Sequence, residues 1–265
     1  MIEQPSFNRI AVTGGAGYLG TLTCRHLQNR GKIVRSIDIV KNSSAPGLWD
    51  EAIVDLADME KVEAALKNVD LVIHLGANLA VDDWSPILQS NIVGTYNIFE
   101  SARRLGIRRV IYASSHHVSG MYRTTTRLDT NAPTRPDSLY GLSKAFAEQT
   151  AQYYWDKYGI ESAGLRIGSA RPKPEQPREH YTWLSEPDYC RLVDACMSTV
   201  LLEHTLVWGI SDNEGGWWDN SLVSHLGYAP RDGAERFDGT MSPADAASLE
   251  FQGGKRALYG LTKKS

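Results

Sequence analysis

The stretch Ile10-Ala11-Val12-Thr13-Gly14-Gly15-Ala16-Gly17-Tyr18-Leu19-Gly20 decides the fold. A short β-branched run leads straight into a glycine-rich loop, and apolar residues at helical spacing follow over Tyr18–Asn29. Glycines allow backbone conformations closed to other residues, and they let a pyrophosphate approach the free N–H groups at the start of a helix. No Gly-Lys-Ser/Thr follows the glycines, which excludes the ATP-binding P-loop. The stretch therefore predicts a dinucleotide-binding loop between a strand and a helix.

Strand-like and helix-like segments alternate through the rest of the first half. Strands are expected at Ile10–Thr13, Ile33–Asp38, Ile53–Asp55, Leu71–Leu75, Val110–Ala113 and Ser162–Ile167. Helices are expected at Tyr18–Asn29, Met59–Lys67, Pro86–Leu105 and Ser138–Tyr158. This order predicts an α/β fold, a Rossmann-type doubly wound parallel sheet with helices on both faces. Such sheets bind ligands at the carboxyl ends of their strands.

The composition changes after Ile167. A proline-rich crossing segment is followed by a helix near Pro187–Val200, a strand near Leu206–Trp208 and a tail rich in Gly and Trp. We therefore expect residues 1–168 to form the cofactor-binding domain and residues 169–265 a small substrate-binding cap, packed on the sheet and unable to fold alone. Trp217 and Trp218 are expected to pin this cap by packing, and not to bind substrate.

Composition bounds the class of protein. The 265 residues are 42% hydrophobic and 22% charged, as in an ordinary globular protein. A net charge of −3 gives no reason to expect nucleic acid or an anionic membrane as a partner. No apolar run reaches the roughly 18 residues that span a bilayer, and the first residues lack a signal-peptide core, so we expect a cytoplasmic protein. Three scattered cysteines predict neither a disulfide framework nor a metal site.

Asp38 stands at the end of the second expected strand. At this spacing from the glycine loop, a carboxylate grips both hydroxyls of an adenosine ribose. The same charge repels a 2′-phosphate, which favours NAD over NADP as the cofactor. Arg35 and Lys41 flank Asp38 and leave some room for NADP.

Tyr140 and Lys144 lie one helical turn apart on one face of an expected helix. They are either a surface pair without consequence or a general base held beside an ammonium group. A tyrosine that works as a base near neutral pH needs its pKa lowered by roughly 3 units, or about 4 kcal/mol. A positive charge about 4 Å away supplies about 4 kcal/mol at an effective dielectric near 20. Ser115, at the end of the fifth expected strand, could hydrogen-bond the reacting oxygen.

Together these elements resemble the extended short-chain dehydrogenase/reductases. The resemblance covers about residues 9–170 and rests on the glycine loop, Asp38, Asp55-Leu56, Asn91-Ile92-Val93-Gly94-Thr95, Ala113-Ser114-Ser115 and Tyr140-Gly141-Leu142-Ser143-Lys144. It implies that Tyr140 is the acid/base, that Lys144 holds the ribose and lowers the pKa of Tyr140, and that Ser115 polarises the substrate oxygen. It implies adenine contacts for Asp55 and Leu56, and support of the catalytic helix and a proton relay for Asn91. The implied NAD site comprises Gly14, Gly17, Tyr18, Leu19, Asp38, Ile39, Asp55, Leu56, Leu75, Gly76, Ala77, Asn91, Tyr140, Lys144 and Ile167.

Later segments resemble one branch, the uronate dehydrogenases. They are His74-Leu75-Gly76, Arg135-Pro136-Asp137-Ser138-Leu139-Tyr140-Gly141, Arg166-Ile167-Gly168-Ser169, Pro172-Lys173-Pro174, Arg178, Thr182-Trp183-Leu184-Ser185, Gly216-Trp217-Trp218-Asp219-Asn220 and Phe251-Gln252-Gly253-Gly254. The resemblance implies oxidation at C1 of a pyranose hexuronate such as galacturonate or glucuronate to its lactone, with hydride passing to NAD. Arg178 would grip the substrate carboxylate, and Ser115, Tyr140, Ser169 and His117 would line the sugar pocket.

Two positions depart from this branch. His116 stands where the branch has asparagine, and Leu79 stands where it has serine, both in the sugar pocket. His116 would add positive charge below about pH 6.5 and favour a stronger anion such as a sulfonate or a phosphate. A C1 dehydrogenase of another aldose, whether sulfonated, phosphorylated or neutral, therefore remains open.

Two further functions remain open. A nucleotide-sugar epimerase or dehydratase is disfavoured because fewer than 100 residues follow the sixth expected strand. A non-catalytic protein that senses the dinucleotide is disfavoured because the chain keeps the Tyr–Lys pair. Family members commonly pair through the two helices expected at 86–105 and 138–158, which implies a homo-oligomer.

Overall fold

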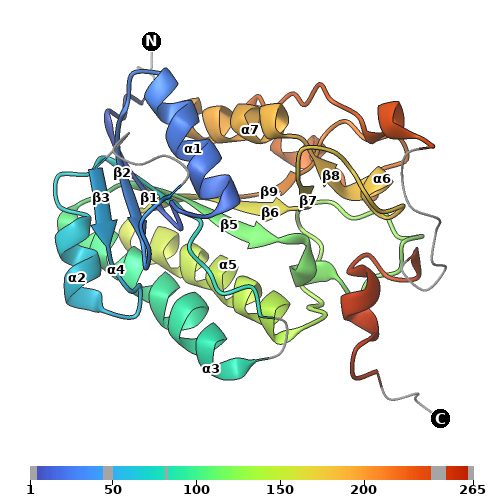
Figure 1. Cartoon of the computed structure of the whole chain (residues 1–265), viewed down its shortest axis with the longest axis horizontal. Helices are drawn as coiled ribbons and strands as arrows, with labels where there is room; N and C mark the ends of the chain where they lie inside the picture. The colour runs from blue at the N-terminus through green and yellow to red at the C-terminus, as the bar shows by residue number, and fades with distance from the viewer. Residues whose placement is uncertain (1–4, 44–49, 81–82, 240–248, 262–265) are drawn as a thin grey trace.

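A parallel sheet forms the centre of the computed structural model, which describes residues 5–43, 50–80, 83–239 and 249–261 (Figure 1). Its seven strands run in the order β3-β2-β1-β4-β5-β6-β9, and every neighbouring pair is parallel. Their bounds are β1 Arg9–Thr13, β2 Ile33–Asp38, β3 Asp50–Ile53, β4 Leu71–His74, β5 Arg109–Ser115, β6 Glu161–Ile167 and β9 His204–Gly209. The strand order reverses between β1 and β4, which opens a crevice at their carboxyl ends. The predicted doubly wound parallel sheet is confirmed.

Helices cover both faces of this sheet. Helices α1 (Tyr18–Asn29) and α7 (Glu186–Ser198) lie on one face, and α2 (Met59–Ala65), α4 (Gly94–Leu105) and α5 (Leu139–Tyr158) lie on the other (Figure 1). An apolar cluster is buried under each helical layer. Burial on both faces explains why the central strands read as continuous apolar runs.

The helix predicted at Pro86–Leu105 is three elements. A short α3 (Trp84–Ile87) passes into a π-helix, η1 (Leu88–Val93), and then into α4. A π-turn inserts one residue, which turns side chains away from the regular helical stripe. Here the turn contains the buried Asn91, and at Gly94 a Cβ would lie only 2.9 Å from the Leu56 side chain.

Two of the first six expected strands differ from the structure by two residues or more in at least one bound. The strand predicted at Ile53–Asp55 lies earlier, as β3, because Asp38 of β2 pairs with Ile53 and the chain leaves the sheet after that residue. This edge strand begins with the charged residues Asp50 and Glu51, so a search for apolar runs does not find its start. The strand β5 runs on to Ser115, past the predicted end at Ala113.

The later segment contributes to the main sheet as well as to the crevice. Strand β9 pairs with β6, and α7 lies beside α1. The remaining elements are β7 (Ser169–Ala170), β8 (Trp183–Leu184), α6 (Glu179–Thr182) and the 3-10 helices η2 (His116–Ser119), η3 (Ser221–Leu226), η4 (Ala234–Phe237) and η6 (Gly254–Leu258). The division into two domains at residue 168 stays a prediction.

Tryptophan packing ties the later segment to the sheet. Trp217 and Trp218 are buried, and Trp218 stacks on Trp208 of β9 with ring centroids 4.8 Å apart. Cys24, Cys190 and Cys196 are free thiols. No helix in the described ranges is both long enough and apolar enough to cross a membrane.

Candidate active site

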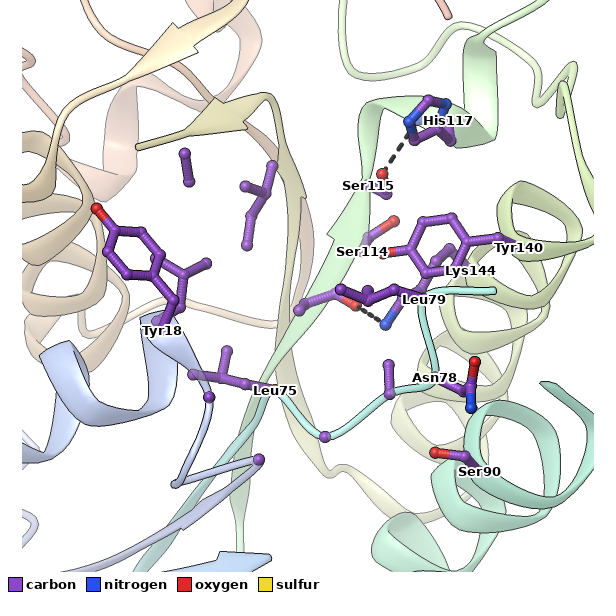
Figure 2. Close-up of a pocket in the computed structure, with 18 of the residues that line it drawn as sticks. Tyr18, Leu75, Asn78, Leu79, Ser90, Ser114, Ser115, His117, Tyr140 and Lys144 are labelled. Atoms are coloured by element: carbon purple, nitrogen blue, oxygen red, sulfur yellow. Dashed lines mark hydrogen bonds between the residues drawn. The ribbon is translucent and has the colours of Figure 1, made fainter. Parts of the chain in front are cut away.

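A cavity of about 940 Å³ opens at the carboxyl ends of the central strands (Figure 2). Twenty of the predicted site residues line it: Gly14, Gly17, Tyr18, Leu19, Asp38, Ile39, Asp55, Leu56, Leu75, Gly76, Ala77, Leu79, Ser115, His116, His117, Tyr140, Lys144, Ile167, Ser169 and Arg178. Asn91 does not line it. The sequence motifs thus converge on one elongated space, of the size that holds a small organic ligand or cofactor.

The glycine loop shapes one end of this cavity. Gly14 has a φ of +68°, and a Cβ there would lie 2.7 Å from the backbone nitrogen of Gly76, so neither strain nor space admits a side chain. Gly17 caps α1 and, because it has no side chain, it accepts no side-chain hydrogen bond from the first turn of that helix. The start of α1 therefore faces the cavity with its N–H groups, as an anion-binding loop requires.

Asp38 stands beside the glycine loop. Its carboxylate accepts hydrogen bonds from the backbone N–H groups of Ala16 (2.9 Å) and Ile39 (2.7 Å). Arg35 is turned away from the cavity: it pairs with Asp50 at 2.6 Å and donates to the carbonyl of Ala65 at 3.0 Å. Arg35 is thus not available to a 2′-phosphate, which removes one of the two cations that left room for NADP.

A buried histidine holds the loop after β4. The Thr13 hydroxyl accepts from the Gly76 N–H (3.1 Å) and is hydrogen-bonded to Nδ1 of His74 (2.7 Å). Nε2 of His74 is hydrogen-bonded to the Thr95 hydroxyl at 3.3 Å. Burial and the nearby Lys144 lower the pKa of His74 to about 3, so the ring is neutral and structural.

Tyr140, Lys144 and Ser115 meet at the centre of the cavity (Figure 2). Tyr140 and Lys144 lie in the first turns of α5, whose start is capped by Ser138 accepting from the Gly141 N–H at 3.1 Å. The Lys144 ammonium donates to the Ala113 carbonyl at 2.8 Å and lies 5.7 Å from the ring centroid of Tyr140. Ser115 hydrogen-bonds the Tyr140 phenol.

Burial acts on both ionisable groups of this pair. It raises the pKa of Tyr140 above its usual value, against the hydrogen bond from Ser115, and it lowers the pKa of Lys144 to about 8. Each charge alone is disfavoured in this surrounding. A phenolate and an ammonium that lie side by side offset part of each other's loss of water.

Two buried contacts fix α5 on the sheet. Asn91 accepts from the Asn78 N–H (2.7 Å) and donates to the Asn78 carbonyl (3.0 Å) and to Ser143 of α5 (2.9 Å). Arg166 of β6 and Glu148 of α5 form a two-point ion pair at 2.8 and 2.9 Å. Asn91 therefore ties α5 to the loop after β4 without lining the cavity, and its roles in NAD binding and in a proton relay stay predictions.

His117 and Asp137 form a buried pair beside Tyr140, at the start of η2 and just before α5. Nδ1 of His117 lies 2.6 Å from the Asp137 carboxylate, which also accepts from Ser138 at 2.8 Å. Burial lowers the pKa of His117 well below its usual value, so the ring is neutral and Nδ1 donates to the carboxylate. The other ring nitrogen is left as an acceptor toward the cavity.

His116 does not carry the positive charge expected of it. Its Nδ1 lies 2.9 Å from the Ile167 carbonyl, which can only accept, and its Nε2 lies 3.3 Å from Nη1 of Arg178, which can only donate. These partners require the neutral ring. Burial, with Arg178 nearby, lowers the pKa of His116 well below its usual value. The expectation that His116 adds charge for a sulfonate or phosphate is therefore wrong; it positions Arg178 instead.

Arg178 reaches the cavity from the turn before α6. Nη1 also donates to the Gln252 carbonyl at 3.0 Å, and Nη2 makes a long contact of 3.5 Å with the Ser169 hydroxyl. Burial lowers the pKa of this guanidinium. Within the described ranges it forms no ion pair, and Nε has no partner. A half-buried guanidinium whose Nε and Nη2 are not held by a close acceptor can bind an anion such as a carboxylate.

Several lining residues carry no motif that the sequence analysis could use. They are Asn78, Gln89, Ser90, Arg171, Gln176, Lys255 and Arg256. Most lie on loops or in the π-helix, and Lys255 and Arg256 come from η6 near the C-terminus. Leu79 lines the cavity but is 67% exposed at its rim. Among the described residues, no group of His, Cys, Asp or Glu is arranged to hold a metal ion.

Comparisons with known proteins agree with this geometry. The family described as NAD dependent epimerase/dehydratase matches residues 10–180. The uronate dehydrogenase of Pseudomonas putida is 42% identical over 260 residues, which are 96% of this chain and 97% of that protein.

Two solved structures are similar over their whole length. A mutant uronate dehydrogenase from Agrobacterium tumefaciens, complexed with NAD, has a TM-score of 0.91 and 39% identity, covering 97% of this chain and 99% of that one. The glucuronic acid dehydrogenase of Chromohalobacter salexigens has a TM-score of 0.90 and 42% identity, covering 96% and 98%. The chain belongs to the NAD dependent epimerase/dehydratase family, in the group of the uronate dehydrogenases.

Proposed function

We propose that this protein is an NAD-dependent dehydrogenase that oxidises C1 of a pyranose hexuronate, such as galacturonate or glucuronate, to its lactone. The observation that carries the proposal is Arg178, a half-buried guanidinium that forms no ion pair in the described part of the chain. It lines the same cavity as Tyr140 and Ser115. The near full-length similarity to uronate dehydrogenases supports the same substrate class.

The residues of the cavity fit NAD. The glycine cradle at Gly14 and Gly76 leaves no room for a Cβ, so the backbone stays open to a pyrophosphate beside α1. Asp38 suits a ribose with two free hydroxyls, and Asp55 and Leu56 line the wall where adenine would lie. The bound cofactor supplies the acceptor for the hydride that leaves C1.

The protein's own groups handle the proton. The Tyr140 phenolate takes the proton of the C1 hydroxyl, and Ser115 donates a hydrogen bond to the sugar oxygen as charge develops on it. Lys144 stabilises the phenolate, and its bond to the Ala113 carbonyl holds it in place. The C1 hydroxyl loses its proton to Tyr140 and C1 loses a hydride to NAD, so the C1–O bond becomes the carbonyl of a lactone.

The sugar is held by its carboxylate and its hydroxyls. Nε and Nη2 of Arg178 offer two parallel donors to the carboxylate, while His116 and the Gln252 carbonyl hold Nη1. The free acceptor nitrogen of His117 and the Ser169 hydroxyl would meet sugar hydroxyls. Leu79 offers the sugar no hydroxyl partner, unlike the serine that the related enzymes have there. Because Leu79 lies exposed at the rim, its larger side chain does not close the pocket.

Other proposals follow from the surface and the context. Outward-facing apolar side chains on α4 and α5, among them Tyr96, Leu142, Phe146 and Tyr153, are at least one-third exposed, and a second copy of the chain would cover them. We therefore propose a homo-oligomer that pairs through these helices. We also propose that it acts in the cytoplasm on a free sugar acid.

A substrate panel tests the function. Formation of reduced cofactor is followed by absorbance with NAD and then NADP, on galacturonate, glucuronate, the matching neutral aldoses and phosphorylated or sulfonated hexoses. The expected result is rapid NAD-dependent turnover of a uronate, with the lactone as the first product by NMR. If only non-acidic sugars were oxidised, Arg178 would not be a binding group for a substrate carboxylate. A product formed without net oxidation would favour an epimerase.

A further inference from the structure

Arg256 stands over the catalytic tyrosine from a part of the chain that carries no cofactor motif. Its guanidinium carbon lies 5.6 Å from the ring centroid of Tyr140, as near as the Lys144 ammonium at 5.7 Å. Resting on the proposed function, we propose that Arg256 is a positioning residue for proton transfer: it stabilises the phenolate form of Tyr140 and so prepares the base.

The C-terminal segment, residues 251–258, is built to hold Arg256 there. Phe251 pairs with Arg123 in an isolated antiparallel bridge, and the Gly253 N–H donates to the Gly120 carbonyl at 2.9 Å. Gln252 is fully buried, and its amide donates to the carbonyls of Thr126 (2.7 Å) and Arg123 (3.2 Å).

The same glutamine connects this segment to the sugar end of the cavity. Its side-chain oxygen accepts from the Trp218 indole at 2.7 Å, and its carbonyl accepts from Arg178. The turn that starts η6 is thus fixed from several sides, and Arg256 follows two residues after Gly254. These contacts hold the backbone beside Arg256 and so fix the position of its charge.

The charges around Tyr140 show what Arg256 adds. Besides Arg256, other ionisable groups lie around Tyr140. Lys144 belongs to α5, the neutral His116 and His117 belong to η2, Asp137 lies just before α5, and Arg178 lies in the turn before α6. The charge of Asp137 raises the pKa of Tyr140, whereas the hydrogen bond from Ser115 and the charge of Arg256 both lower it. Arg256 therefore offsets the one carboxylate that opposes ionisation of the base.

Arg256 forms no ion pair in the described ranges, and it lines the cavity. A carboxylate paired with an arginine would cancel much of the arginine's field, whereas Arg256 has no such ion pair among the described residues and its charge acts to lower the pKa of Tyr140. A full charge within 6 Å of the ring, at protein-like dielectric, moves an ionisation by about one to two pH units. Loss of Arg256 should therefore shift the pH at which the base becomes active.

The test compares Arg256→Gln with Arg256→Lys and with Arg123→Gln. Arg123 serves as the matched control because it lies over the Phe251 ring of the same segment, at 4.5 Å, but outside the cavity. The pH dependence of kcat/KM is measured with a uronate and NAD. In parallel, the ionisation of Tyr140 is titrated in the protein without cofactor, by the ultraviolet difference from the matching variant that also carries Tyr140→Phe.

Arg256→Gln should move the acidic limb of the kcat/KM profile, and the titration of Tyr140, to higher pH by about one unit or more. Arg256→Lys should restore most of the shift, and Arg123→Gln should leave both unchanged. An equal loss of activity at every pH, or a raised KM for uronates alone with an unmoved limb, would overturn the proposal. If no uronate is oxidised by the unaltered protein, the proposed function fails, while the titration still decides the role of Arg256.

Discussion

Replacing Arg178 with glutamine removes the charge of the anion site and keeps most of the side chain's volume. In the structure, Nη1 is already held by His116 and Gln252, so Nε and Nη2 are the donors left for a ligand. A charge-assisted hydrogen bond contributes about 1.5–3 kcal/mol to binding. Loss of this clamp should therefore raise the KM for a uronate about 10- to 150-fold.

The assay compares each uronate with its neutral aldose in the same protein. Because a neutral aldose has no carboxylate for Arg178 to hold, its kcat/KM should change little in Arg178→Gln. Arg178→Lys keeps the charge but loses the two-point fork, and should fall between the wild type and the glutamine variant. A similar loss for the acid and for the neutral sugar would show that Arg178 merely supports the fold, and the anion-site argument would be refuted.

Three further outcomes follow from the contacts described. Tyr140→Phe should abolish turnover while calorimetry still detects NAD binding, because the ring remains and only the oxygen that takes the proton is lost; retained turnover would exclude Tyr140 as the base. Asp38→Ser should shift the ratio of kcat/KM for NAD over NADP by about tenfold or more toward NADP, since the carboxylate that repels a 2′-phosphate is gone; an unchanged ratio would place cofactor selection elsewhere. Asp194→Asn should lower the free energy of unfolding most below about pH 6.5. The hydrogen bond with Asp194 raises the pKa of His26 to about 9, above its value in the unfolded chain. The stabilisation from this bond is therefore complete below about pH 6.5 and is lost as the pH rises through about 9. Urea unfolding at several pH values measures that difference; one that is constant with pH would assign it wholly to the ion pair of Asp194 with Arg30.

The parallel sheet was predictable because local signals agreed with one another. Continuous apolar runs, the glycine loop and helical spacing all indicated the same order of strands and helices, and α1 begins and ends where predicted. The edge strand β3 was misplaced because all four of its residues are exposed or only half-buried, so the strand carries charged residues and no continuous apolar run. The π-helix at Leu88–Val93 was missed because its cause is tertiary: it brings Asn91 to Asn78 and Ser143.

The cofactor end of the site was easier to predict than the sugar end. Glycines and Asp38 act through short-range backbone geometry that leaves a spacing in the sequence. Arg178, His116 and Arg256 belong to segments far apart in the chain, and no periodicity links them. The protonation state of His116 in particular depends on the Ile167 carbonyl and on Arg178, and residue type alone therefore suggested the wrong charge.

The most direct test of the proposed function is the ratio of kcat/KM for galacturonate over galactose, and for glucuronate over glucose, with NAD and the unaltered protein. We expect a ratio of at least about tenfold in favour of at least one acid, because only the acid engages Arg178 next to the Tyr140 base. Equal turnover of the acid and the neutral sugar, or no turnover of either acid, would contradict it.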